Sequence, residues 1–120
     1  MVITDYNRNQ ISLFLGGSAT NYVDYFVIGS GSGTASATDT ALVYPVDRQL
    51  ATATTYPAAR KVKWQGDWDS VNLSGIQLKQ FGMITSGAGV TGSVWSINSL
   101  PALTFDGTNE LRIEETWEVY

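Results

Sequence analysis

The chain has 120 residues, 43% of them hydrophobic and 15% charged, which is the size of one domain with enough apolar material for a compact core. The net charge of −4 argues against a nucleic-acid binder and against attraction to an anionic membrane surface. His and Cys are absent, which excludes disulfides, thiolate metal sites and the commonest catalytic base. No apolar run approaches the ~20 residues of a membrane helix. The N-terminal sequence lacks the pattern of a signal peptide.

The first part of the chain contains two segments that resemble strands. Residues 1–10 are expected to form an arm that orders only against a neighbouring molecule. The apolar run 11–15 predicts a short strand, which the following pair of glycines ends. Residues 22–28 are aromatic and β-branched, and they predict a longer strand that ends at Gly29.

Small polar residues follow this strand. Residues 29–40 contain only Gly, Ser, Thr, Ala and one Asp, which predicts a loop. The best helix candidate in the chain is a single turn over 38–43, with Thr38 or Asp39 as its N-cap. Residues 46–55 are polar and rich in Thr, and we expect them to be extended.

The second half of the chain shows further strand patterns. Residues 61–65 alternate with a period of two, which directs Val62 and Trp64 toward a core. The apolar positions of 73–84 change parity along the segment, which a β-bulge near Lys79–Gln80 would explain.

Two more strands complete the expected set. Residues 90–100 predict a strand that Pro101 ends, and residues 111–120 predict the closing strand. We therefore predict an all-β, single-domain antiparallel β-sandwich or jelly roll over 11–120, preceded by the arm 1–10. It should contain about six to eight strands and at most one short helical turn.

The glycine loop invites comparison with nucleotide-binding loops. Its sequence from residue 29 to residue 34 is GSGSGT, whereas the dinucleotide fingerprint G-x-G-x-x-G has a third glycine and opens a helix. A P-loop needs Gly-Lys-Ser/Thr, and no Lys precedes Lys61. We interpret Gly29, Gly31 and Gly33 as the residues that shape a turn between strands, and we expect no cofactor.

One short segment combines acidic and aromatic residues. Asp67 and Asp69 would share one face of a strand and could meet a hard cation such as Ca²⁺. Because two carboxylates alone bind weakly, we favour a solvated turn and predict no metal site. Trp64 and Trp68 could stack on a sugar, although core or interface anchoring is the favoured interpretation.

The closing strand is acidic. Glu114 and Glu118 would lie on one face roughly 13 Å apart, beyond the separation of the paired carboxylates in glycosidases. We interpret them as a charged outer face, or as partners for basic residues of a neighbouring subunit. Glu115 lies on the apolar face, so its carboxyl group needs a partner or a raised pKa. Candidate partners are the side chains of Arg48, Arg60 and Arg112.

Residues 25–42 resemble a pattern that recurs in small proteins of tailed bacteriophages: an apolar strand, a G-x-G-[ST] loop, a short Ala/Ser spacer and [ST]-D-T-A-L. Residues 78–84 are similar to a later I-x-E-x-G-[LI]-F segment of that family, with Gln80 and Ile84 at the positions of the usual Glu and Phe. The Trp-containing strand at the end also resembles the family, so the similarity spans roughly residues 22 to 120.

The resemblance implies a tail, tail-fibre or minor virion protein that has no catalytic residues and docks in a symmetric particle. It further implies assembly in the cytoplasm of a bacterial host, other virion proteins as partners, and a homo-oligomer of three or six copies. On physical grounds, we expect the Asp39 carboxylate to accept hydrogen bonds from the N–H groups of Ala41 or Leu42. Leu42 would then plug the edge of the core.

The leading hypothesis is a non-enzymatic structural component of a tailed-phage virion, associated with the tail or neck or decorating the head. The alternative is a carbohydrate- or receptor-binding module at a tail tip or fibre. Exposed Trp64 and Trp68 beside the two aspartates would support this alternative, and burial of both rings would count against it. A hydrolase would need two carboxylates that converge in a cleft, and it is the least favoured class.

Overall fold

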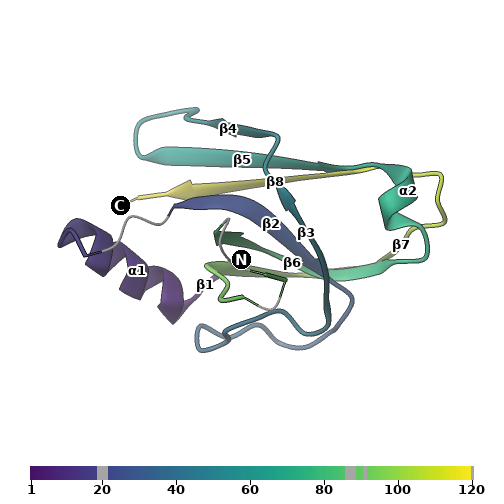
Figure 1. Cartoon of the computed structure of the whole chain (residues 1–120), viewed down its shortest axis with the longest axis horizontal. Coiled ribbons are helices and arrows are strands. Elements are labelled where there is room, and N and C mark those ends of the chain that lie inside the picture. Colours follow the sequence, from purple (N-terminus) through teal and green to yellow (C-terminus); the bar gives the residue numbers. More distant parts are fainter. Residues whose placement is uncertain (19–21, 86–88, 91, 120) are drawn as a thin grey trace.

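The computed structural model describes residues 1–18, 22–85, 89–90 and 92–119, and its strands form two antiparallel sheets (Figure 1). The larger sheet has the order β1-β7-β6-β2-β3 and comprises β1 (Val2–Ile3), β2 (Val23–Gly29), β3 (Pro45–Leu50), β6 (Gln77–Thr85) and β7 (Ser96–Thr104). The smaller sheet has the order β4-β5-β8 and comprises β4 (Ala53–Thr55), β5 (Lys61–Trp68) and β8 (Leu111–Glu118). The predicted all-β antiparallel fold is confirmed, with eight strands among the described residues.

Most predicted strands correspond to observed ones. The segment 22–28 corresponds to β2, and 61–65 is the first part of β5. The extended segment 46–55 divides into β3 and β4, and 111–120 corresponds to β8. The last predicted position, Tyr120, lies outside the described residues.

Two helices accompany the sheets, α1 (Asp5–Leu15) and α2 (Ser70–Leu73). The prediction of a strand over 11–15 is wrong, because these residues form the second half of α1. Thr4 caps this helix, since its side chain accepts a hydrogen bond from the Asn7 N–H at 3.2 Å. An apolar run of five residues fits a helix as well as a strand, so its length alone does not separate the two.

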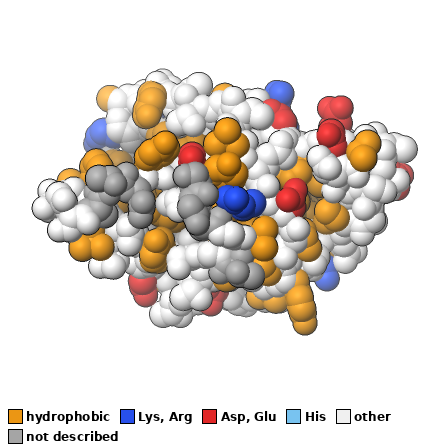
Figure 2. Space-filling model, viewed as in Figure 1, with side chains coloured by type: hydrophobic (Ala, Val, Ile, Leu, Met, Phe, Trp, Pro, Cys, Tyr) orange, Lys and Arg blue, Asp and Glu red, His pale blue; other side chains and the backbone are white. Residues whose placement is uncertain are grey.

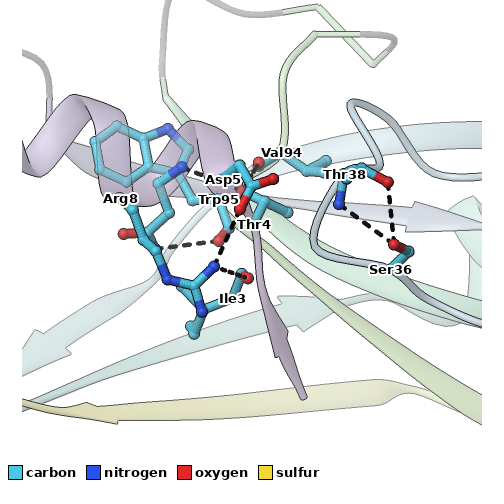
Figure 3. A network of polar contacts seen from close by, with 9 residues as sticks. Ile3, Thr4, Asp5, Arg8, Ser36, Thr38, Val94 and Trp95 are labelled. Carbon is cyan, nitrogen blue, oxygen red and sulfur yellow. Dashed lines mark hydrogen bonds and ion pairs between the residues drawn. The ribbon is translucent and has the colours of Figure 1, made fainter.

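The N-terminal residues pack against their own chain. In β1, Val2 pairs with Ile97 of β7. The Thr4 hydroxyl donates to the Val94 carbonyl at 2.6 Å, and the Asn7 amide donates to the Trp95 carbonyl at 3.1 Å (Figure 3). The structure therefore seats residues 1–10 on the domain itself, where the sequence led us to expect an arm ordered by a neighbour.

The core between the two sheets is rich in aromatic side chains. Phe26 lies edge-on to Trp68 with ring centroids 6.2 Å apart, and Trp64 contacts Trp117 at 4.6 Å. Trp64 faces this core as predicted, and Val62 packs against it partly buried. The remaining buried members are Val23, Ile28, Leu73, Leu78, Met83, Trp95, Phe105 and Ile113.

A second apolar cluster lies on the opposite face of the larger sheet. It joins Val27 of β2 and Ile84 of β6 to Leu42, a residue of the loop between β2 and β3. Val94 and Ile97 complete its buried members. The larger sheet is thus covered on one face by the smaller sheet and on the other face by a loop.

The predicted bulge is confirmed, because the β6–β7 register shifts between Leu78 and Gln80. The prediction that Pro101 ends a strand is wrong. Strand β7 starts at Ser96, later than the predicted 90–100, and it continues to Thr104. β1 pairs only with Ser96 and Ile97, and the β6–β7 register shifts between Ser99 and Leu103, so Pro101 lies where β7 has an open outer side and an irregular ladder, a position that tolerates proline. Within the predicted segment, Thr91 lies outside the described residues.

Replacement of Leu42 tests the second cluster. Leu42→Ala should lower the free energy of unfolding by about 2–4 kcal/mol, because it leaves a cavity beneath the loop. Val71→Ala, at a position on α2 that is largely exposed, is the control and should change this free energy by less than about 0.5 kcal/mol. Urea unfolding followed by Trp fluorescence measures both. Equal stability of the two variants would contradict a buried role for Leu42.

Candidate functional site

The glycine loop is closely packed against the segment that precedes β3. The N–H of Gly31 donates to the Val43 carbonyl at 3.0 Å, and the N–H of Ser30 donates to the Tyr44 carbonyl at 3.0 Å. A Cβ atom on Gly31 would lie 2.3 Å from the Val43 oxygen, whereas a Cβ atom on Gly33 would meet no atom within 4 Å. Gly29 is intermediate, since its Cβ would lie 3.2 Å from that same oxygen. Gly31 is therefore required by the close approach of two backbone segments.

Asp39 closes a turn, but with other partners than expected. Its carboxylate accepts from the Ser36 N–H at 2.8 Å, and its own N–H donates to the Ser36 carbonyl at 3.0 Å. The prediction that it binds the N–H groups of Ala41 or Leu42 is wrong, as is the helical turn predicted over 38–43. The hydrogen-bonded turn lies at residues 37–38, before Asp39, and the Thr40 carbonyl accepts from the Val94 N–H at 3.0 Å.

The position expected for Leu42 is confirmed, because its side chain is buried in the second cluster. Next to it, the side-chain oxygen of buried Gln80 accepts from the Val43 N–H at 3.0 Å. This hydrogen bond ties the loop to β6 and was not predicted from the sequence. Together these contacts hold Gly31 and Leu42 against the sheet and direct the N–H groups of Ser30, Gly31 and Val43 at protein oxygens.

Asp67 and Asp69 serve separate local structures. The Asp67 carboxylate accepts from Arg112 at 2.8 Å, from Thr52 at 2.7 Å and from Gln65 at 3.2 Å. These bonds, with that of Arg112 the largest contribution, lower the pKa of Asp67 to about 2. Asp69 caps α2 by accepting from the Asn72 N–H at 2.8 Å. Among the described residues, no three acidic side chains are grouped closely enough to hold a metal ion.

Trp64 and Trp68 are both core residues, with exposed fractions of 5% and 1%. The indole N–H of Trp64 donates to the Val23 carbonyl at 3.0 Å, and that of Trp68 donates to the Asp47 carboxylate at 3.2 Å. Neither ring presents a face to solvent. The sugar-stacking interpretation therefore has no exposed platform at these two residues.

Glu115 is buried between the sheets and is held by neutral donors. Its carboxyl oxygens accept from the hydroxyl of Ser96 and the indole N–H of Trp117, both at 2.7 Å, and from the amide of Asn98. Burial raises the pKa of Glu115, and the three hydrogen bonds oppose that rise only in part.

Glu115 was expected to have either a partner or a raised pKa, with Arg48, Arg60 and Arg112 as the candidate partners. Its pKa is raised, and the side chains that bond it are neutral and not arginines. Arg112 pairs with Asp67, and the Arg48 guanidinium lies 4.7 Å from the ring centre of Tyr25. The polar link that Glu115 forms instead runs from β8 to β7 and thus joins the two sheets.

One surface was missed by the sequence interpretation. Ile11, Phe14 and Leu15 lie at helical spacing on α1 and, together with Tyr22, form what we call the α1 surface. Phe14, Leu15 and Tyr22 are 59%, 79% and 72% exposed. A hollow of about 220 Å³ lies between Ile11, Phe14, Tyr22 and the ring of Trp95. Figure 2 shows hydrophobic side chains reaching the surface at several places, with acidic and basic groups between some of them.

The α1 surface is uncharged over a continuous stretch, since no Asp, Glu, Lys or Arg occurs between Asn9 and Ser18. Such a stripe differs from the usual surface helix, whose apolar face is turned to the core. The signal that could have found it is the i, i+3, i+4 spacing of Ile11, Phe14 and Leu15 after a Thr cap.

No protein-family model matches the chain, and no curated protein matches it. In the described part of the chain, no helix is both long enough and apolar enough to cross a membrane. The functional assignment therefore rests on the chemistry of the residues themselves.

A pair of glycine variants tests the packing of the loop. Gly31→Ala should lower the free energy of unfolding by about 1–3 kcal/mol, because the added methyl group overlaps the Val43 carbonyl. Gly33→Ala is the matched control, and its methyl group enters open space. Thermal melts of the two variants should differ by several degrees. A loop that tolerates both changes equally would contradict the close approach seen at Gly31.

Replacement of Glu115 tests the effect of its burial. Because its pKa is raised in the folded state, this residue adds stability at low pH, and the stability is lost as pH rises from about 4.5 through the folded pKa. Glu115→Gln cannot ionise, and its oxygen still accepts from Ser96 and Trp117 while Asn98 turns its amide to accept in return.

The free energy of unfolding of Glu115→Gln should therefore fall less than that of the wild type between pH 5 and pH 8. Urea unfolding at a series of pH values measures this slope. Glu115→Leu removes all three hydrogen bonds and should be less stable than Glu115→Gln at every pH. Parallel pH curves for the wild type and Glu115→Gln would contradict a shifted pKa.

Proposed function

We propose that this chain is a non-enzymatic structural component of a tailed-phage virion that acts by docking on other proteins of the particle. The α1 surface is the observation that carries the docking role. Its four side chains expose roughly 500 Å² if a full side chain offers ~200 Å². That area lies in the upper half of the range found for the largest apolar patch on ordinary monomers.

The chemistry of the α1 surface indicates the kind of partner. It carries no charge, so its complement is an apolar, uncharged surface of another virion protein. The assignment to a phage particle is supported by the resemblance over residues 22 to 120. A tail, neck or head position is compatible with it, as is assembly into three or six copies.

The alternative functions are less well supported. The burial of Trp64 and Trp68 removes the surface on which a glycan-binding interpretation depended. Two of the acidic residues named as candidates form ion pairs, Asp67 with Arg112 at 2.8 Å and Glu114 with Lys63 at 3.2 Å, and Asp69 caps α2. A docking role uses the exposed apolar residues of α1, which the glycan-binding and hydrolase interpretations leave unexplained.

Composition of purified particles tests this proposal. Particles of the phage that encodes the chain, purified on a density gradient, should contain it at a fixed copy number by quantitative mass spectrometry. A chain with Phe14→Glu and Leu15→Glu should fold but be depleted at least tenfold from particles, because a charge in an apolar contact is costly.

Val71→Glu is the matched control, since it places the same charge on the exposed face of α2, and it should be incorporated normally. Absence of the wild-type chain from purified particles would overturn the virion assignment. Normal incorporation of the double variant would instead show that docking uses another surface.

A further inference from the structure

Strand β8 presents an unusually long open edge. It is the end strand of the order β4-β5-β8, and it forms eight consecutive pairs with β5, from Lys61–Glu118 to Trp68–Leu111, with no break in register. The other edge strands are shorter or interrupted: β1 has two residues, β4 has three, and β3 begins with Pro45. A straight, unbroken edge is a template for pairing with another strand.

The direction of the backbone groups on β8 follows from the ladder. The Val119 N–H donates to the Arg60 carbonyl at 2.8 Å, and bonding in an antiparallel ladder alternates between successive residues. The odd-numbered residues of β8 therefore bond to β5. The N–H and C=O groups of Arg112, Glu114 and Thr116 point away from it, and no hydrogen bond from another described residue reaches them.

The charges on this edge select one way for two copies to pair. If two β8 strands meet across a two-fold axis, the even-numbered residues of one copy bond to those of the other. An axis at Glu114 would place two Glu114 side chains opposite each other, and an axis at Thr116 would place Glu114 opposite Glu118. An axis at Glu115 instead places Arg112 opposite Glu118 twice and Glu114 opposite Thr116 twice. An axis at Ile113 would also set Arg112 opposite Glu114, but it pairs only residues 111–115 of β8, whereas the axis at Glu115 pairs residues 112–118 and sets opposite charges against one another. Within each chain Arg112 also bonds Asp67 and Glu114 also bonds Lys63, so the pairs across the axis add to these contacts.

We infer that β8 pairs with β8 of a second copy of this chain in an antiparallel ladder about a two-fold axis at Glu115. The two smaller sheets then become one sheet of six strands. This inference goes beyond the proposed virion role and does not depend on it, because it concerns the purified chain in solution.

The apolar side of the edge is suited to this arrangement. In the register centred on Glu115, Ile113 of one copy lies beside Trp117 of the other, and Leu111 lies beside exposed Val119. A hollow of about 510 Å³ adjoins the edge at Trp117, with β1 residues Met1 and Ile3 among its lining.

Glu115 limits the affinity of the two copies for each other. Two Glu115 carboxyl groups would flank the axis, and like charges opposite each other weaken a strand pair. Each Glu115 carboxyl group accepts hydrogen bonds from the neutral side chains of Ser96 and Asn98 on its own β7. The charged amino terminus of the same chain acts to lower the pKa of this carboxyl group. Glu115→Gln should therefore tighten the association.

Substitutions at Thr116 test the inference because its N–H lies on the open edge. The wild-type chain should show a monomer–dimer equilibrium by analytical ultracentrifugation over a concentration series. Thr116→Pro removes one edge donor from each copy and no bond to β5, so it should yield a monomer with an unchanged circular dichroism spectrum.

Charge variants at the same position test the register. Thr116→Lys faces Glu114 of the second copy only when the axis lies at Glu115, and it should tighten the dimer about tenfold. Thr116→Glu should weaken it by a similar factor. In the registers centred on Glu114 and on Thr116, Thr116→Lys would face Arg112 or a second Lys and would weaken the dimer. In the register centred on Ile113 it would face Glu110, which precedes the start of β8.

Three results would overturn the inference. A wild-type chain that stays monomeric at the highest concentration shows that the edge does not pair. A dimer that persists in Thr116→Pro, with the fold intact, shows that another surface forms it. A dimer that Thr116→Lys weakens and Thr116→Glu tightens shows that the register is wrong. If Thr116→Pro fails to fold, the two charge variants still decide the matter.

Discussion

The burial of β2 on both faces is the constraint on which the rest of this structure depends. Phe26 and Ile28 point into the core between the sheets, and Val27 points to the opposite side. A strand that is apolar on both faces needs cover on both, and the smaller sheet supplies only one. The loop between β2 and β3 supplies the other, with Leu42 as its anchor. This requirement explains why a segment of small polar residues is closely packed.

The same constraint explains the contacts of the loop. The backbone at Gly31 has to lie close to the backbone at Val43 for Leu42 to reach the sheet, and the absence of a side chain at Gly31 permits this approach. Gln80 projects from the covered face of β6 and satisfies the Val43 N–H, which would otherwise lose its water partner on burial. The glycine-containing loop between β2 and β3, whose sequence invites comparison with nucleotide-binding loops, thus carries the residue that covers one face of the larger sheet.

The strands and the bulge could be predicted from the sequence because they depend on local alternation. Trp64 and the parity change near Gln80 are examples, since each is decided by residues a few positions away. The helix α1 was missed because an apolar run of five residues fits both periods, and its cap at Thr4 precedes it by seven positions. The partners of Glu115 could not be predicted, because Ser96 and Asn98 meet it only through the packing of β7 against β8.

The anchoring of the N-terminus has a consequence for biosynthesis. Thr4 is hydrogen-bonded to Val94, ninety positions later, and β1 pairs with the start of β7. During synthesis β1 and α1 therefore wait for the segment around Val94 and the start of β7 before their docking surface exists. During that interval the apolar residues of α1 have no intramolecular partner, and a nascent chain is exposed to chaperones and to association with its neighbours on the same messenger.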